Sequence, residues 1–123
     1  MISPTLSQEV TTLHAELCSA LADPKRILML YALSEKPCTV NELAEALGLN
    51  QPTTSRHLGM LRERGLVLAQ REGQTVINTL ADPRVIQALD LLRAVLNSKL
   101  KNQAALVEIQ IPPQEDSQPT GEL

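Results

Sequence analysis

The sequence is nearly devoid of aromatic residues: it has no tryptophan, no phenylalanine and a single tyrosine, Tyr31. Proteins that bind single-stranded nucleic acid, and the common RNA-recognition modules, stack bases on aromatic side chains. This chain cannot build such a platform. Among nucleic-acid partners, the sequence therefore favours duplex DNA over single strands.

Metal-binding and catalytic motifs are also missing. The two cysteines, Cys18 and Cys38, form no CxxC pair and no Cys/His zinc framework, so we expect no metal and no cofactor. No glycine-rich phosphate loop is present, and no nucleophile and base stand out except the coincidence of Cys18 with His14. The sequence accordingly predicts that the protein is not an enzyme.

Long apolar runs are missing as well. No stretch approaches the roughly 20 apolar residues that cross a bilayer, and the N-terminus has no basic region followed by an apolar block. We expect a cytoplasmic protein without a membrane partner. In that reducing compartment the two cysteines are expected to be free thiols rather than a structural disulfide.

What the chain does have is an uneven distribution of charge. The net charge is -3 over 123 residues, which taken alone disfavours binding to nucleic acid. Residues 50–80, however, contain four arginines against two glutamates, a local charge of +2, so the remainder of the chain carries −5. The arginines of this region are Arg56, Arg62, Arg64 and Arg71.

The same region contains a predicted helix-turn-helix. Asn50 can cap a helix that begins at the next residue, and Pro52 suits its first turn. Gly65 marks the end of this helix. Just upstream, Thr39 and Glu42 have the spacing of a capping box, and a glycine ends that shorter helix. Two short helices joined by a tight turn are typical of a helix-turn-helix.

Hydrophobic periodicity predicts the remaining elements. Helices are expected at residues 7–21, at 24–34 and from 82 to about 100, and strands at 66–71 and 75–80. The two strands form a hairpin, so the order of elements is ααααββα. The expected fold class is mainly α, a winged helix-turn-helix.

The expected domain organisation has three parts. Residues 8–104 form the dimerisation and DNA-binding domain. Residues 1–7 are predicted to be a flexible arm. Residues 105–123 are polar and rich in proline, which predicts a disordered tail.

The first and last predicted helices carry more apolar surface than one small domain can cover. Leucines recur on their stripes at Leu13, Leu17, Leu89, Leu92 and Leu96. A domain of this size has only a modest core, so burial between two copies adds stability. We therefore expect a homodimer with the first and last helices at its interface.

Four segments, in this order, resemble the ArsR/SmtB family of bacterial transcriptional repressors. They are LADPKRIL at 21–28, NELA at 41–44, QPTTSRHLGMLRERGLV at 51–67 and REG at 71–73. The resemblance covers roughly residues 12–100. It implies a homodimer that represses its own promoter, with two recognition helices in successive major grooves and two wings over the flanking backbone.

The predicted recognition helix and hairpin supply the candidate DNA contacts. Side chains in the N-terminal half of a helix that lies in the major groove reach base edges. The candidates for base contact are Gln51, Thr53, Thr54, Ser55 and Arg56. The candidates for phosphate or minor-groove contact are Arg62, Arg71 and Gln74, and His57 matches the family's Ser-x-His-Leu pattern. The alternative for each is an ordinary solvated face, and for His57 a capping or packing role.

Metal-sensing members of the resembled family carry sites that this chain lacks. Zinc-sensing members have an Asp-x-His and two further ligands on the last helix. Here Asp82 is kept, but Arg84, Val95 and Ser98 stand at the other three positions. Arsenic- and cadmium-sensing members have Cys-x-Cys at the start of the third helix, and Cys38 lies one residue too early to reproduce it.

Cys18 and Cys38 remain as candidate sensor thiols. Cys18 lies four residues after His14, on the same side of the first helix. Cys38 precedes the third helix, whose positive N-terminus is expected to lower the thiol pKa and favour the thiolate. One hypothesis is that an oxidant, a reactive sulfur species or a thiophilic metal or arsenite acts on both thiols. The other is that Cys18 is a small apolar residue and Cys38 an ordinary loop residue.

The sequence therefore predicts a dimeric repressor that binds double-stranded operator DNA and is released by a thiol-directed signal from an unknown small inducer. One alternative is a repressor of the same type whose effector does not act on cysteine. The other is a winged helix used only for protein–protein contact, against which the local positive charge argues.

Overall fold

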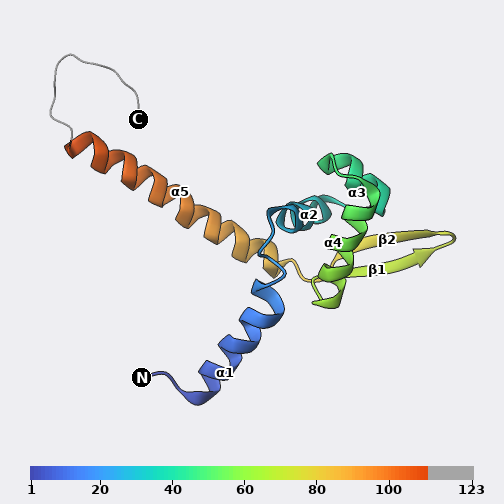
Figure 1. Cartoon of the computed structure of the whole chain (residues 1–123), viewed down its shortest axis with the longest axis horizontal. Coiled ribbons are helices and arrows are strands. Elements are labelled where there is room, and N and C mark those ends of the chain that lie inside the picture. Colours follow the sequence, from blue (N-terminus) through green and yellow to red (C-terminus); the bar gives the residue numbers. More distant parts are fainter. Residues whose placement is uncertain (111–123) are drawn as a thin grey trace, which may run out of the picture. The chain divides into compact units, whose positions relative to one another are not determined.

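The computed structural model describes residues 1–110 and confirms the winged helix-turn-helix (Figure 1). The described residues divide into two units, residues 1–86 and residues 87–110. The first unit contains the helix-turn-helix and the hairpin. The helices are α1 (Pro4–Leu13), a short π-helix η1 (His14–Cys18), α2 (Pro24–Glu35), α3 (Val40–Leu47), α4 (Gln51–Glu63) and α5 (Arg84–Gln110), and the strands are β1 (Val67–Glu72) and β2 (Thr75–Leu80).

The caps predicted for α3 and α4 are confirmed. The Thr39 hydroxyl accepts a hydrogen bond from the Glu42 amide at 3.1 Å, and the Glu42 carboxylate accepts one from the Thr39 amide at 2.9 Å, which completes the capping box. The Asn50 side chain accepts from the Thr53 amide at 2.8 Å. Gly48 ends α3 with a φ of 67°, a left-handed conformation that glycine adopts without a Cβ clash. These local bonds fix the turn between the two helices.

The hairpin is antiparallel, with its register running from Val67 opposite Leu80 to Glu72 opposite Thr75. Its first strand begins one residue later than predicted, because the Leu66 amide bonds to the Leu61 carbonyl and closes the end of α4. Figure 1 shows the hairpin extending away from the helices. It forms the wing.

The core of the first unit lies between α2, α3, α4 and the base of the hairpin. Its fully or nearly fully buried side chains are Met29, Leu30, Leu33, Leu43, Leu58, Leu61, Leu66 and Val67. Six of them recur at helical spacing along the three helices, while Leu66 and Val67 belong to the start of the hairpin. This core holds α4 against α2 and α3.

A single-residue bridge ties the loop before α3 to the middle of β2. The Cys38 amide donates to the Asn78 carbonyl at 3.0 Å, and the Asn78 amide donates to the Cys38 carbonyl at 2.8 Å. The Asn78 side chain, only 2% exposed, also donates to the Cys38 carbonyl at 3.1 Å. The wing is therefore anchored to the start of α3 as well as to α4.

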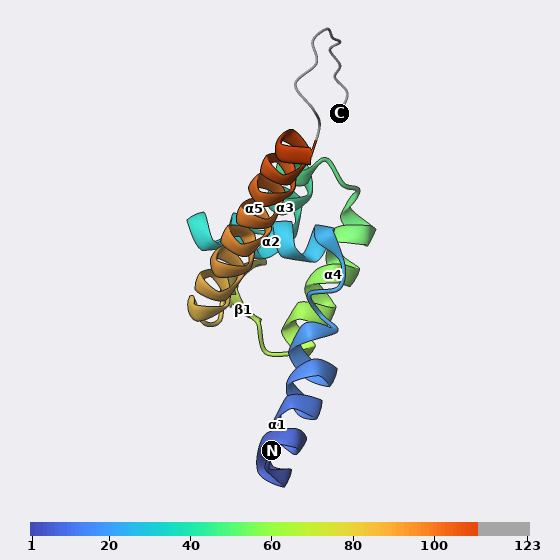
Figure 2. The same ribbon diagram turned by 90° about the vertical axis from the view of Figure 1, so that its left-hand side faces the viewer.

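The first helix differs from its prediction at both ends. It begins at Pro4 rather than at residue 7, because the Ser3 hydroxyl caps it by accepting from the Leu6 amide at 3.1 Å. The predicted arm of residues 1–7 is therefore too long. The regular helix ends at Leu13 and continues as the π-helix η1. No residue of α1 is buried, and Figures 1 and 2 show it extending away from α2, α3 and α4.

The described part of the second unit, residues 87–110, belongs to helix α5. This helix is longer than predicted, since the expected tail of residues 105–123 is helical as far as Gln110. Residues 103–106 read QAAL, all good helix formers, which explains why the helix continues. Residues 111–123 of the predicted tail lie outside the described residues. Large apolar side chains are exposed along this part of α5 at Leu91, Leu92, Val95, Leu96 and Leu100.

Candidate nucleic-acid interface

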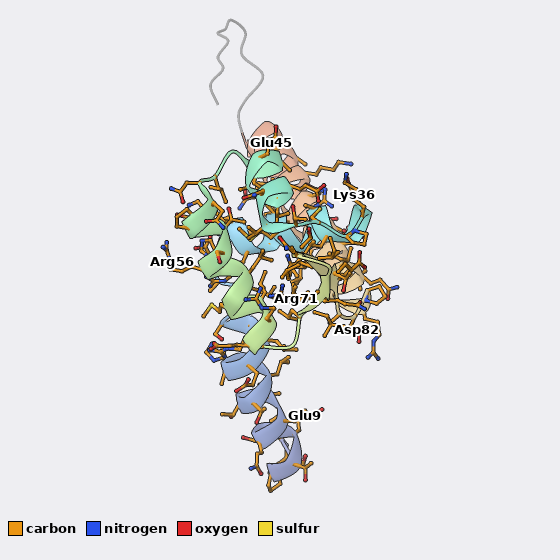
Figure 3. The ribbon with its side chains drawn as sticks, turned by 90° about the vertical axis from the view of Figure 1, so that its right-hand side faces the viewer. Glu9, Lys36, Glu45, Arg56, Arg71 and Asp82 are labelled. Atoms are coloured by element: carbon orange, nitrogen blue, oxygen red, sulfur yellow. The ribbon has the colours of Figure 1, made fainter. Side chains whose placement is uncertain are left out.

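One side of α4 presents polar groups that the chain itself does not use. Gln51, Ser55 and Arg56 are exposed, and Thr53 is partly exposed. Within residues 1–110, the Arg56 guanidinium makes no hydrogen bond and no ion pair, and Figure 3 shows it pointing outward from the helix. Four of the five predicted base-contact residues thus lie where an outside partner can reach them.

The fifth, Thr54, lies elsewhere. It is 0% exposed, and its hydroxyl donates to the Asn50 carbonyl of the preceding turn at 2.9 Å. The prediction placed Thr54 on the reading side, but its methyl group and its satisfied hydroxyl belong to the core. A buried threonine commonly bonds back to the carbonyl four residues earlier.

His57 also faces inward, which agrees with the packing role rather than with the DNA contact among the two predicted alternatives. Its Nδ1 lies 3.2 Å from Nη1 of Arg26 on α2, and its Nε2 lies 3.9 Å from the Asp23 carboxylate. Burial lowers the pKa of His57, and the positive charges of Arg26, Arg56 and Lys25 lower it further, while Asp23 opposes them. The neutral ring is therefore favoured, with Nδ1 accepting a hydrogen bond from Arg26.

The predicted phosphate contacts lie around the wing. Arg71 and Gln74 are exposed on the hairpin, and Figure 3 shows Arg71 there. Arg62 leans from α4 toward β2, where its Nη1 lies 3.5 Å from the Asn78 side-chain oxygen. A hollow of about 570 Å³ separates the start of α3 from α4 and β2, and Ser55, Arg62 and Gln74 all line it. The structure thus brings together predicted residues from the helix and from the wing.

Sequence reasoning missed two polar residues that line the same hollow, Thr39 and Asn41. Both belong to the start of α3, and Thr39 was noticed only as a cap. The sequence could have indicated both residues. In a helix-turn-helix, the first residues of the helix that precedes the recognition helix lie close to the N-terminal half of the recognition helix. What the sequence did not show is that the wing closes the third side of this hollow.

A pair of arginines ties the end of the first helix to α2 and α4. Arg64, which follows α4, donates through Nη1 to the Ala15 carbonyl and, at 3.1 Å, to the Ser19 hydroxyl. Arg26 donates through Nε to the Ala20 carbonyl at 2.6 Å and through Nη2 to the Ser19 carbonyl at 3.2 Å. A helix end leaves carbonyls without intrahelical partners, and these guanidiniums satisfy them. Neither role was predicted.

The two candidate sensor cysteines differ in their surroundings. Both are free thiols, Cys18 exposed and Cys38 only 5% exposed. Burial raises the pKa of Cys38, and the nearby Glu42 carboxylate raises it further. Burial and the acidic neighbours therefore argue against the thiolate predicted at the start of α3. The Cys38 thiol instead donates to the Lys36 carbonyl at 3.4 Å.

Neither a metal-binding cluster nor a membrane-spanning helix occurs within the described residues. Within residues 1–110, no three His, Cys, Asp or Glu residues gather closely enough to hold a metal ion. Over the same residues, no helix combines the length and the apolar character needed to cross a membrane.

Comparisons with known proteins agree with this geometry. Residues 23–68, which span α2, α3, α4 and the start of β1, match the model described as "Bacterial regulatory protein, arsR family". The HTH-type transcriptional regulator NmtR of Mycobacterium tuberculosis is 38% identical over 88 residues, which cover 72% of this chain and 73% of NmtR. The chain belongs to the arsR family. Its members are DNA-binding transcriptional regulators rather than enzymes.

Two further relatives of this arsR-family chain extend the comparison. The biofilm growth-associated repressor of Agrobacterium fabrum is 31% identical over 99 residues, 80% of this chain and 84% of that protein. A solution structure of the homodimeric winged helix-turn-helix DNA-binding domain of Mb0332 from Mycobacterium bovis has a TM-score of 0.69 and 29% sequence identity. That structure covers 82% of this chain, and this chain covers 93% of it.

Proposed function

We propose that this arsR-family regulator is a homodimeric repressor that places α4 in the major groove of duplex operator DNA. The observation that carries the proposal is the unused side of α4, where Gln51, Ser55 and Arg56 are exposed beside the wing. Side chains of these types read base edges: Gln can pair with adenine, Arg with guanine, and Ser with either. A dimer seated on a promoter blocks access to it, which is repression.

Within this proposal the contacts divide between bases and phosphates. Gln51, Thr53, Ser55 and Arg56 meet base edges from the N-terminal half of α4. The remaining contacts come from the hollow beside α4 and from the wing, through Arg62, Arg71 and Gln74. Phosphate contacts fix the register of a protein on the duplex without carrying sequence information.

The proposed dimer joins the first and last helices of two copies. Exposed apolar side chains occur on α1 at Leu6, Val10 and Leu13, and on α5 at the leucines and valine given above. A monomer gains nothing from exposing them, whereas an isologous interface removes them from water. The solved structure of the Mb0332 domain is described as homodimeric, which supports a homodimer here.

The test of dimerisation is Leu92→Glu. Leu92 is 63% exposed on α5, so a glutamate there is harmless to a monomer and costly inside an apolar interface. We expect sedimentation velocity to show a dimer for the wild type and a monomer for this variant. The matched control is Asp90→Asn, which alters a polar position on the same helix. An unchanged Leu92→Glu dimer would remove α5 from the interface.

The test of DNA binding is a gel shift on the DNA upstream of the chain's own coding sequence, with a scrambled duplex as competitor. We expect a complex that survives the competitor and weakens steeply as salt rises, since phosphate contacts release counterions. Binding to neither duplex would leave a winged helix that acts only on other proteins.

For the release signal, we propose that any thiol-directed inducer acts first at Cys18. Its side chain is exposed, whereas Cys38 is buried with a raised pKa. Thiolate character and access govern thiol reactivity, and Cys38 has neither. In a gel shift with hydrogen peroxide or arsenite, Cys18→Ser should lose the response while Cys38→Ser retains it. An equal response of wild type and the double variant would favour an effector that does not act on cysteine.

A further inference from the structure

Gly59 is the feature of α4 that the fold leaves unexplained. It lies inside the helix, four residues before the last one, Glu63. Glycine in a helix interior is less favourable than alanine by roughly 0.5–1 kcal/mol, because it loses more backbone freedom on folding. A glycine at such a place needs a reason, either within the chain or outside it.

Nothing in the described part of the chain requires glycine at residue 59. Gly59 does not have the positive φ of Gly48, Gly65 and Gly73. Apart from its two chain neighbours and the backbone of α4 itself, a Cβ at residue 59 would meet one described heavy atom within 4 Å, Nη2 of Arg62 at 3.8 Å, which is ordinary van der Waals contact. Neither backbone conformation nor crowding by another element therefore requires glycine at this position.

The space beside Gly59 is a shallow hollow on the outer side of α4. It has a volume of about 650 Å³ and is lined by Arg56, Gly59, Met60, Arg62 and Glu63. Arg56 lies three residues before Gly59 and Arg62 three residues after it, so one guanidinium flanks the glycine from each side. We call this place the Gly59 notch.

The charge of the Gly59 notch favours an anion. Two arginines face it against one glutamate, and Arg56 has no hydrogen bond or ion pair among the described residues. A guanidinium pairs well with phosphate oxygens through its planar fork of donors.

We propose that the Gly59 notch seats a phosphate of the operator backbone, and that glycine is present so that this strand can approach the backbone of α4. The inference rests on the proposed function. A base contact would call for a side chain that reaches into the groove. A missing side chain instead gives close approach of two backbones, which is a common use of glycine. The phosphate lies between Arg56 and Arg62. The guanidinium N–H groups of Arg56 that do not bind the phosphate remain available to a base edge.

The test compares Gly59→Ala with Glu63→Gln. The probe is the duplex that wild-type protein selects from a random pool, with a scrambled duplex of the same composition as reference. Alanine places a methyl group where the strand would approach, and it is a better helix former, so the thermal unfolding midpoint should rise by a few degrees. Affinity should nevertheless fall by roughly tenfold, as for the loss of one charge-assisted contact. The loss should be equal on both duplexes, since a phosphate contact carries no sequence information.

Glu63→Gln alters the same notch in the opposite direction. It removes the one negative charge without adding volume, so affinity for both duplexes should rise. Stability should change little, because Glu63 is exposed.

The outcomes separate the two proposals. If the wild type selects no duplex, the proposed function fails. If the wild type binds and Gly59→Ala binds equally well, the notch does not meet DNA. A lower unfolding midpoint for Gly59→Ala would show that glycine serves the fold. A changed base preference would replace the phosphate with a base.

Discussion

The two sides of α4 differ in whether their side chains are buried and bonded within the protein. On the inner side, Leu58 and Leu61 are 0% exposed, the Thr54 hydroxyl is bonded to the helix backbone, and His57 is engaged by Arg26. On the outer side, the Arg56 side chain makes no hydrogen bond to any described residue, and Gly59 has no side chain.

The difference shows which groups the chain keeps for itself. Each inner group contributes to the free energy of unfolding, since it is buried or satisfied by a partner. The outer groups contribute little to it, because solvent already satisfies them. Substitutions on the inner side should therefore change stability. They should weaken DNA binding only by reducing the fraction of folded protein. Substitutions that shorten an outer side chain should change binding while stability stays constant. Gly59→Ala is the exception, because alanine also favours the helix.

The largest expected effect is that of Leu58→Ala. Leu58 is completely buried between the helices of the first unit, so the substitution leaves a cavity and loses about 2–5 kcal/mol of unfolding free energy. Urea denaturation followed by circular dichroism measures it. At a temperature where the variant stays folded, its DNA affinity should approach that of the wild type. A folded variant with strongly impaired binding would place Leu58 on the reading side.

Arg26→Ala should have the next largest effect. Arg26 bonds to two carbonyls at the end of the first helix and to His57, with its side chain only 12% exposed. Removing it takes this donor from the part-buried Ala20 carbonyl and from Nδ1 of His57, which we expect to cost about 2–3 kcal/mol of unfolding free energy. The exposed neighbour provides the control: Lys25→Ala should change stability by less than about 0.5 kcal/mol. Equal effects of the two variants would show that the bonds of Arg26 do not stabilise the fold.

Arg56→Ala should reverse this pattern. We expect it to leave the urea midpoint unchanged and to weaken operator binding by about tenfold, the value of one good contact to a base. Its control is Arg71→Ala on the wing, which should weaken binding to operator and scrambled duplex alike and reduce the salt dependence. Fluorescence anisotropy at fixed salt measures both. If Arg56→Ala lowered stability and left binding unchanged, Arg56 would serve the fold, and the proposed difference between the two sides of α4 would be wrong.

The smallest effect concerns pH and His57. Its pKa in the folded chain lies below its usual value of 6.5, so the unfolded chain binds this proton more tightly. The stability that depends on the neutral ring is complete above about pH 6.5 and is lost as pH falls through the lowered pKa. Between about pH 7 and pH 5 the thermal midpoint of the wild type should fall more than that of His57→Gln. The lowered pKa of Asp23 acts at more acidic pH, below its usual 3.8.

His14→Gln is the control for that comparison, because His14 is the second histidine of the chain and is exposed. It should follow the wild-type pH profile. If His57→Gln and the wild type gave the same profile, the Arg26–His57 contact would not depend on a neutral ring.

Local signals predicted most of the fold. The caps at Thr39 and Asn50 and the glycine at 48 act over a few residues, so the helix-turn-helix could be located from sequence to within a residue. The hairpin and the order of the elements followed from periodicity. The sequence did not predict that Ser3 caps α1 earlier than expected. It also did not predict the π-helix, because a hydrogen-bond spacing one residue longer than in an α-helix leaves no mark in the apolar pattern over five residues.

The assignment of side chains to the two sides of α4 was harder. Periodicity shows that α4 has an inner stripe but not how wide it is, because its width depends on which helices pack there. Arg26 bonds to the His57 ring from 31 residues away, and the Asn78 side chain bonds to the Cys38 carbonyl from 40 residues away. Nothing within a few residues of His57 or Cys38 indicates these partners. The position of His57 therefore depends on a long-range contact, whereas the raised pKa of Cys38 reflects both its burial and the nearby Glu42.

The most direct measurement is the base preference of the wild type and of Arg56→Ala, obtained by selection from a pool of random duplexes. For a dimer that reads through the outer side of α4, the wild type should select a sequence repeated with two-fold symmetry, its halves about one helical turn apart. Arg56→Ala should lose the preference at one base pair in each half and keep the others. An identical selected sequence for both proteins would contradict the account.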